Sequence, residues 1–142
     1  GEALFPAMVE AIDAARSEVM LETYIFDFTR SALSVAEVLE RLWGGEETLI
    51  VISSDLSHYL PYVQARAADR QTVETILRLD PALEHHQACG ATPLSGALLA
   101  ARAHDLVPRL LDLRNSGDTA GDRKRVVGYA AFAFTEKSGH AH

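Results

Sequence analysis

A run of aliphatic residues, Leu49–Ile52, limits most strongly what this chain can fold into. Such a run, with no polar residue inside it, is typical of a strand buried on both faces of an α/β sheet. The run ends abruptly in the polar sequence Ser53–His58. Because ligands of open α/β sheets collect at the carboxyl ends of the strands, the sequence predicts a site that contains Asp55 and His58. The alternative is that the serines and Asp55 only cap the next helix, with His58 on the surface.

The composition defines the class of protein. With 142 residues, of which 48% are hydrophobic and 23% charged, the chain is expected to form one folded domain. Its net charge of -7 argues against non-specific binding to nucleic acids or to anionic membranes. The single cysteine excludes an intrachain disulfide and favours a reducing, cytoplasmic setting. No apolar run approaches the roughly 20 residues of a membrane-spanning helix, and the sequence shows no signal-peptide pattern.

Periodic patterns predict regular structure before the central run. Helical spacing of apolar residues predicts a helix over residues 4–16, and alternation predicts a strand over residues 18–28. Ser34 and Glu37 form a capping box, which predicts the start of a further helix. That helix is expected to end at the glycine pair 44–45.

After the central run, the sequence predicts two helices and then two strands. The helices are expected over Leu60–Asp80 and Leu94–His104, and the strands over Val107–Leu113 and Lys124–Thr135. The polar loop between the two strands lacks the glycine and lysine pattern of a P-loop. One face of the first helix is charged and is expected to be solvated, and it carries Arg66, Asp69, Arg70, Glu74 and Arg78.

Residues 81–93 hold a second group of chemically active side chains. They include His85, His86 and the only thiol, Cys89. Histidine and cysteine are the ligands that bind zinc, iron and copper most readily, although this spacing is too compact for a zinc finger. A single cysteine is most often a small buried hydrophobic residue. Cys89, however, is expected in a turn directly before a helix, where exposed N–H groups favour the thiolate.

The first residues resemble the N-terminal segment of phospholipase D-like phosphatidyltransferases of the cardiolipin synthase type. The resemblance covers residues 1–28 and rests on the helix sequence GEALFPAMVEAIDAAR and the strand sequence LETYIF. That family's chemistry depends on an H-x-K-x-x-x-x-D motif, whose histidine attacks phosphorus, and this motif does not occur in the chain. We therefore expect residues 1–28 to serve packing instead of lipid chemistry.

Three later blocks together resemble the Memo family, known in bacteria and archaea as AmmeMemoRadiSam system protein B. They are ETLIVISSDLSHYLPY, HHQACGATPLSGALLAAR and LLDLRNSGDTAGDRKRVVGYAAFAF, within residues 32–136. The family is similar in fold to class III extradiol dioxygenases. The resemblance thus implies an α/β sandwich with a mainly parallel sheet, incomplete at its N-terminus. The expected organisation is a phospholipase D-like segment over 1–28, a Memo-like domain over 29–136 and a disordered tail over 137–142.

The Memo resemblance also implies a metal-type pocket and assigns residues to it. Cys89, His58 and His85 would bind a transition metal, either iron, copper or zinc. Asp55 would orient His58, and His58 would act as a catalytic acid and base. Complete family members have a longer domain, whose N-terminal half supplies two further histidines. We therefore expect this chain to be a chimera or a rearranged product, with a vestigial pocket that binds metal weakly.

The sequence leaves three functions open. The first is an enzyme-like metal pocket. The second is a non-catalytic protein-interaction module, since animal members of the Memo family are regarded as binding phosphotyrosine peptides and bacterial members are associated with radical-SAM proteins. The third is a remnant of a phosphatidyltransferase. A bare sheet edge would also favour a homodimer or another protein partner. The pocket requires that Asp55, His58 and Cys89 converge in one cleft, with the Cys89 sulfur within roughly 10 Å of the His58 ring.

Overall fold

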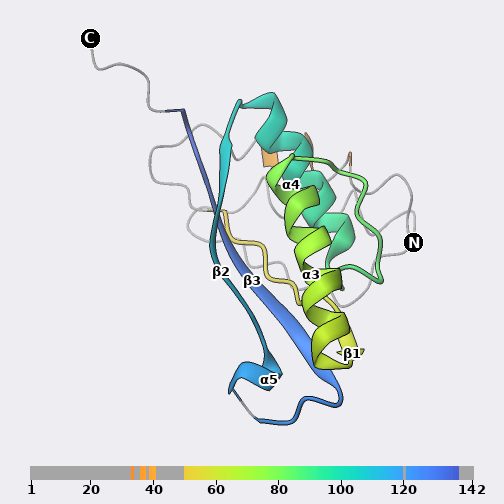
Figure 1. The fold of residues 1–142 in the computed structure, drawn as a ribbon. Coiled ribbons are helices and arrows are strands. Elements are labelled where there is room, and N and C mark those ends of the chain that lie inside the picture. The colour runs from red at the N-terminus through yellow and green to blue at the C-terminus, as the bar shows by residue number, and fades with distance from the viewer. Residues whose placement is uncertain (1–32, 34–35, 38, 41–49, 120, 138–142) are drawn as a thin grey trace.

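In the part of the chain that the structure describes, helices and strands pack around a small hydrophobic core. The computed structural model describes residues 33, 36–37, 39–40, 50–119 and 121–137. None of the described helices is long and apolar enough to span a membrane. The elements in these residues are, in chain order (Figure 1), β1 (His58–Leu60), α3 (Tyr62–Leu77), α4 (Ala91–Ala103), β2 (Val107–Asn115), α5 (Ser116–Thr119) and β3 (Val126–Thr135).

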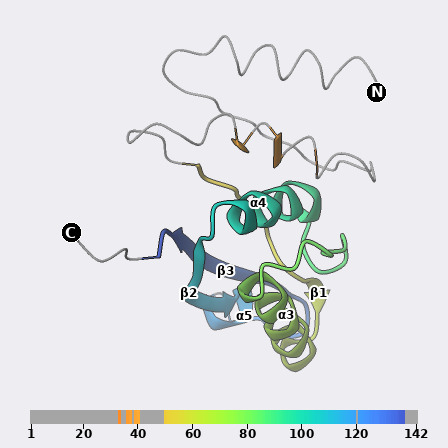
Figure 2. The same ribbon diagram turned by 90° about the horizontal axis from the view of Figure 1, so that it is seen from above.

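Both helices predicted in this part of the chain are confirmed. α3 begins directly after Pro61, and its C-terminal end is followed by Leu79, which adopts a left-handed conformation with a φ of 53°. α4 begins directly after Gly90, slightly earlier than predicted, and ends at Ala103. Their arrangement can be followed in two views: α3 lies beside β2 and β3, and α4 lies toward the end of the molecule opposite to α5 (Figures 1 and 2).

The sheet is antiparallel, so the predicted mainly parallel sheet is wrong. Its strand order is β1-β3-β2, and β3 pairs antiparallel with both neighbours. The reason lies in the connection between β2 and β3. A parallel pair needs a crossover of a dozen or more residues, whereas only residues 116–125 connect these strands. The α/β class is confirmed, and the likeness in fold to extradiol dioxygenases stays a prediction.

Both strands predicted after α4 form, as β2 and β3. They share a long ladder with one irregularity, where Leu111 is an extra residue on β2. The alternation predicted for β3 is present, since Val126 and Gly128 are buried while Tyr129 is exposed. The core cluster and the apolar side chains packed against it come from α3, α4, the sheet and the loops, namely Leu56, Val73, Ala88, Leu94, Leu113, Ala130 and Phe132.

The prediction of a buried strand over Leu49–Ile52 is wrong in the described part of that run. Its described residues form no strand ladder, and Val51 is 76% exposed. β3 pairs instead with the residues that follow. The N–H of Leu56 donates to the carbonyl of Gly128 at 2.9 Å, and β1 begins at His58. Because a strand needs a neighbour that satisfies its backbone groups, regular pairing starts only where β3 is within reach.

Asp69 is buried, so its predicted place on the solvated face of α3 is wrong. The residue is only 2% exposed, and its Oδ1 accepts a hydrogen bond from the N–H of Ser57 at 3.0 Å. Its carboxylate lies against Gly128, where an added Cβ would collide with both carboxylate oxygens. Because Gly128 has no side chain, the Asp69 carboxylate has room to pack against β3. Arg66 and Arg70 on the same helix are exposed, as predicted.

The elements predicted before the central run lie mostly outside the described residues. This holds for the helix over 4–16 and for the strand over 18–28. The helix predicted from Ser34 is described at a few positions, all of which are helical. Two of them, Ala36 and Leu39, are each 8% exposed. The described part of this helix therefore has a buried side.

Asp118 ties α5 to α3. Its Oδ1 accepts a hydrogen bond from the Tyr62 hydroxyl at 2.6 Å, and its Oδ2 accepts one from the N–H of Asn115 at 2.9 Å. The Tyr62 hydrogen bond, then that of Asn115 and the attraction of Arg66 and Arg123, lower the pKa of Asp118 from its usual 3.8. Its ionised form therefore stabilises the fold above pH 3.8, and this stabilisation is lost as the pH falls through the lowered pKa.

Gly128→Ala is expected to destabilise the protein, because the added methyl group would occupy space that the buried Asp69 carboxylate fills. Overpacking of this kind costs about 1–3 kcal/mol. The free energy of unfolding in urea measures the effect. The control is Gly121→Ala, where the space around the Cβ is open and the cost comes from a φ of 83° alone. The packing would be contradicted by a Gly128→Ala variant as stable as the wild type.

Tyr62→Phe is expected to weaken the dependence of stability on acidic pH, because it removes the main cause of the lowered pKa of Asp118. The measurement is the free energy of unfolding from about pH 2 to about pH 6. Tyr129→Phe is the matched control, since the Tyr129 hydroxyl has no hydrogen bond to any described residue. If both variants kept the pH profile of the wild type, the assignment to Asp118 would be wrong.

Candidate metal centre

Three side chains that are distant in the sequence converge near β1. Asp55, His58 and Cys89 each offer one ligand atom, and these atoms lie within 4.8 Å of one another. Within this group, Asp55 Oδ2 and His58 Nε2 lie 3.6 Å apart. The predicted convergence is therefore confirmed. Its predicted location at the ends of parallel strands is wrong, because the group lies between the segment that leads into β1 and the turn before α4.

Backbone hydrogen bonds fix the segment that carries Asp55 and His58. The N–H of Leu56 donates to the carbonyl of Gly128, and the N–H of Gly128 donates to the carbonyl of Ser57, both at 2.9 Å. Leu56 is buried in the core, with 3% of its surface exposed. Since the residues between the two ligands are held on β3, their side chains project from a fixed support.

Cys89 is joined to Asp55 by two reciprocal contacts. The N–H of Cys89 donates to the carbonyl of Asp55 at 3.2 Å. In the other direction, the N–H of Asp55 donates to Cys89 Sγ at 3.3 Å. Cys89 is exposed and lies directly before the N-terminus of α4, as predicted, so the alternative of an ordinary buried cysteine does not hold. The two contacts bring the sulfur to the carboxylate although the residues are far apart in the chain.

Ser54 has a supporting role that the sequence did not reveal. Its Oγ accepts a hydrogen bond from the N–H of Gly90 at 2.9 Å and lies 3.5 Å from Cys89 Sγ. The approach depends on the glycine, because a Cβ at position 90 would lie 2.9 Å from the Cβ and Oγ of Ser54. The sequence signal was Gly90, directly after the cysteine. It served only to predict a turn before the next helix, and its close contact with Ser54 was not foreseen.

His58 is brought to the group by extended backbone, although its i, i+3 spacing from Asp55 would also allow contact on a helical turn. Residues 55–57 are not helical, and His58 is the first residue of β1. Tyr59 has a left-handed φ of 58°, and the pairing with β3 is irregular between His58 and Leu60. Bulges of this kind re-aim side chains and are frequent next to active sites. The Tyr59 ring centre lies 5.9 Å from that of His58 and flanks the imidazole.

His85 does not belong to the converging group. It is exposed, and the group consists of the other three residues. Its neighbour His86 is also exposed, with Nδ1 lying 3.1 Å from Oε2 of Glu84. The assignment of His85 as a metal ligand stays a prediction.

The donor set fits a transition-metal ion. Carboxylate, imidazole and thiolate bind zinc at about 2.0–2.3 Å, in a tetrahedral arrangement. At these lengths, an oxygen and a nitrogen ligand lie about 3.4 Å apart, close to the 3.6 Å between Asp55 and His58. A nitrogen and a sulfur ligand lie about 3.6 Å apart, and the separations here stay within 4.8 Å. The three side chains therefore have the donor types and the proximity that such an ion requires.

Comparisons with known proteins identify relatives of this chain. A family model described as Memo-like protein matches residues 23–133, which include the three converging residues. A MEMO1 family protein of Methanopyrus kandleri is 36% identical over 110 residues, covering 72% of this chain and 37% of that protein. One of Aeropyrum pernix is 35% identical over 109 residues, covering 70% of this chain and 39% of that protein.

A third relative, a MEMO1 family protein of Aquifex aeolicus, is 35% identical over 97 residues, covering 63% of this chain and 36% of that protein. The chain thus spans less than two fifths of the length of these relatives. The family match also begins at residue 23, inside the segment 1–28 that resembles phospholipase D-like enzymes.

Proposed function

The chain belongs to the Memo family, and we propose that its Asp55, His58 and Cys89 bind a transition-metal ion. The observation that carries the proposal is the convergence of three ligand atoms within 4.8 Å. Further support comes from the contacts that fix the group, namely the paired hydrogen bonds between Asp55 and Cys89. Metal sites depend on such outer contacts to orient their ligands.

Each of the three residues has a defined part in this proposal. Cys89 provides the thiolate, His58 provides Nε2 and Asp55 provides a carboxylate oxygen. Three protein ligands leave one position of a tetrahedral ion for water or substrate, as in catalytic zinc sites. An ion held there would supply a Lewis acid. When Nε2 of His58 binds the ion, that atom is no longer available as an acid or base, so the two roles of His58 exclude each other.

The proposed metal is zinc, iron or copper. A thiolate ligand selects these ions over magnesium and calcium, which prefer oxygen ligands only. The exposed position of Cys89 leaves the site open to solvent on one side. Because the chain covers under two fifths of its relatives, we restrict the proposal to metal binding and assign no reaction.

The alternative is a non-catalytic protein-interaction module, the second function left open by the sequence. In that case the three side chains would form a surface contact and the protein would hold no metal. A lipid headgroup-transfer activity has less support, because the chain lacks the H-x-K-x-x-x-x-D motif. Metal analysis therefore separates the main proposal from the alternative.

Cys89→Ser is expected to abolish stoichiometric metal binding, because it removes the only thiolate. The full chain is loaded with Zn²⁺ or Co²⁺, freed of excess ion, and analysed for metal per chain. The wild type should retain one ion, and Co²⁺ should show a thiolate charge-transfer absorption that the variant lacks. His58→Gln should lower the affinity by more than the roughly 10- to 100-fold that loss of a supporting contact costs.

The matched control is His86→Gln, since His86 is an exposed histidine in the same turn region as Cys89 but outside the group. It should bind metal like the wild type, and circular dichroism should show that all variants are folded. A folded wild type without metal would overturn the proposal and favour the interaction module. Equal metal content in Cys89→Ser and wild type would have the same consequence.

Ser54→Ala is expected to lower the metal affinity about 10- to 100-fold without unfolding the protein, because the hydroxyl holds the turn that presents Cys89. Competition with a chelator measures the affinity. The control is Ser53→Ala, an exposed serine at the adjacent position. If Ser54→Ala bound the metal as tightly as Ser53→Ala, the supporting role of the hydroxyl would be disproved.

A further inference from the structure

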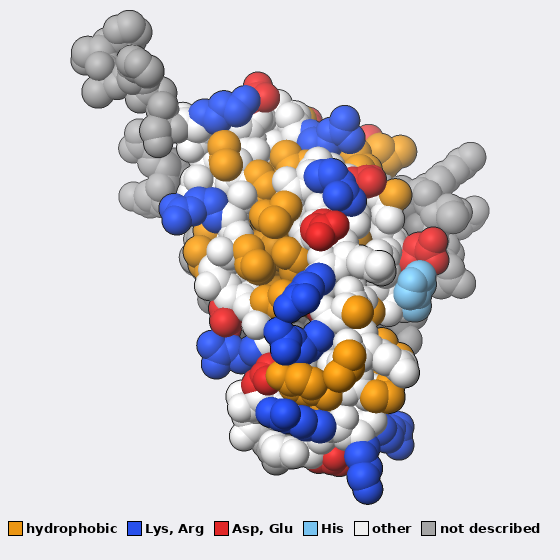
Figure 3. Space-filling model, viewed as in Figure 1, with side chains coloured by type: hydrophobic (Ala, Val, Ile, Leu, Met, Phe, Trp, Pro, Cys, Tyr) orange, Lys and Arg blue, Asp and Glu red, His pale blue; other side chains and the backbone are white. Residues whose placement is uncertain are grey.

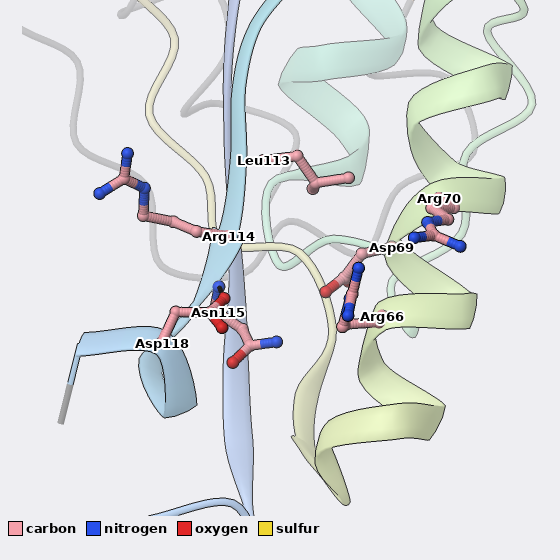
Figure 4. Close-up of a pocket in the computed structure, with 7 residues that line it drawn as sticks. All are labelled: Arg66, Asp69, Arg70, Leu113, Arg114, Asn115 and Asp118. Atoms are coloured by element: carbon pink, nitrogen blue, oxygen red, sulfur yellow. Dashed lines mark hydrogen bonds between the residues drawn. The ribbon is translucent and has the colours of Figure 1, made fainter. Parts of the chain in front are cut away.

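A second group of side chains lies on the face formed by α3 and the end of β2. The face contains two hollows of about 210 Å³ and 230 Å³. Each hollow is lined by both Arg66 and Arg70, which lie one turn apart on α3. The first hollow lies between α3 and the residues that follow Leu113 (Figure 4). On the same face, Lys and Arg side chains form a row beside hydrophobic ones (Figure 3). Neither hollow includes a residue of the metal-type group.

Three arginines of this face have no direct ion pair with a described acid. Among the described residues, Arg66, Arg70 and Arg123 form no ion pair with a carboxylate. Two other arginines do, since Arg78 pairs with Glu74 and Arg114 pairs with Asp112. Unpaired cations are unexpected in a chain with a net charge of -7, where acids are in excess.

The two acids that line the first hollow are engaged elsewhere. Asp69 is 2% exposed and accepts the N–H of Ser57. Asp118 accepts the hydroxyl of Tyr62 with one oxygen and the N–H of Asn115 with the other. Both carboxylates are thus used as hydrogen-bond acceptors, and neither forms an ion pair with Arg66 or Arg70, although Arg66 and Arg123 attract the Asp118 carboxylate. The donors of Arg66 and Arg70 are therefore available to an external anion.

Two features prepare the hollow for such an anion. The Tyr62 ring lies under two guanidinium groups, with ring-centre distances of 5.7 Å to Arg66 and 4.4 Å to Arg123, which limits their freedom. Asn115 is 1% exposed, and its Oδ1 accepts the N–H of Gly117 at 2.9 Å. Its side chain points toward α3 (Figure 4), so its NH₂ group adds a neutral donor opposite the arginines.

We propose that this hollow binds the phosphate group of a small molecule, through Arg66 and Arg70 on α3 and the amide of Asn115. Guanidinium groups match the oxygens of phosphate in pairs. A hollow of about 210 Å³ has room for a phosphate with part of the group that carries it. Arg123 adds positive charge from the side of Tyr62. Arg114 is not part of the site, because its guanidinium points away from α3 (Figure 4).

Titration calorimetry with inorganic pyrophosphate, at low ionic strength and with EDTA present, tests the proposal on the full chain. The wild type should bind one pyrophosphate. Arg66→Gln and Arg70→Gln should each weaken binding about tenfold or more, since each loses charge-assisted hydrogen bonds. The matched control is Arg78→Gln on the same helix, which lies outside both hollows and pairs with Glu74. It should bind like the wild type.

Three results would overturn the proposal. The first is a folded wild type that shows no heat of binding. The second is an Arg78→Gln variant that loses as much affinity as Arg66→Gln, in which case only the net charge of the face matters. The third is binding that occurs only without EDTA and disappears in Cys89→Ser, which would place the pyrophosphate on a metal ion. Because EDTA removes metal ions, the measurements made in its presence also keep this test independent of the proposed metal site.

Discussion

Hydrogen bonds that clamp residues 54–57 between β3 and the turn at Cys89 support the rest of this structure. On one side, Leu56 and Ser57 exchange backbone hydrogen bonds with Gly128. On the other side, the backbone of Asp55 and that of Cys89 are joined at 3.2 Å. Without these bonds, the segment that carries Asp55 and His58 would not be held against the turn that carries Cys89. The convergence therefore follows from backbone pairing, with attraction between the side chains as a minor contribution in an exposed site.

Local patterns in the sequence predicted the helices and strands whose formation depends on local structure. α3, α4, β2 and β3 formed where the apolar periodicity placed them, because each buries one face against the same core. The residues of the metal-type group could be found from the sequence because few other residues combine these chemistries next to turn-forming residues such as Gly90. They are Asp55, His58 and Cys89. The family resemblance then joined two segments that no periodicity relates, and the family match confirms it.

The remaining features depend on which segments meet, and periodicity carries no such information. The apolar run with Val51 matched a buried strand, yet β3 pairs with the residues after it. Asp69 fitted a charged helix face, yet Gly128 on a distant strand offers it room. Ser54 supports the thiol only because Gly90 has no side chain. In each case a partner far along the chain decides the outcome.

Asp69 links the two proposed sites and also explains why they should act independently. Its carboxylate accepts the N–H of Ser57, between the two ligands of the β1 segment, and its side chain lines the hollow of Arg66 and Arg70. Coupling between sites requires an element with two arrangements that both ligands bias. Asp69 is 2% exposed, accepts the N–H of Ser57 and lies against Gly128, where an added Cβ would not fit. The structure shows one arrangement of this carboxylate, so the support that both groups share offers no second arrangement through which an anion at the arginines would alter the metal ligands.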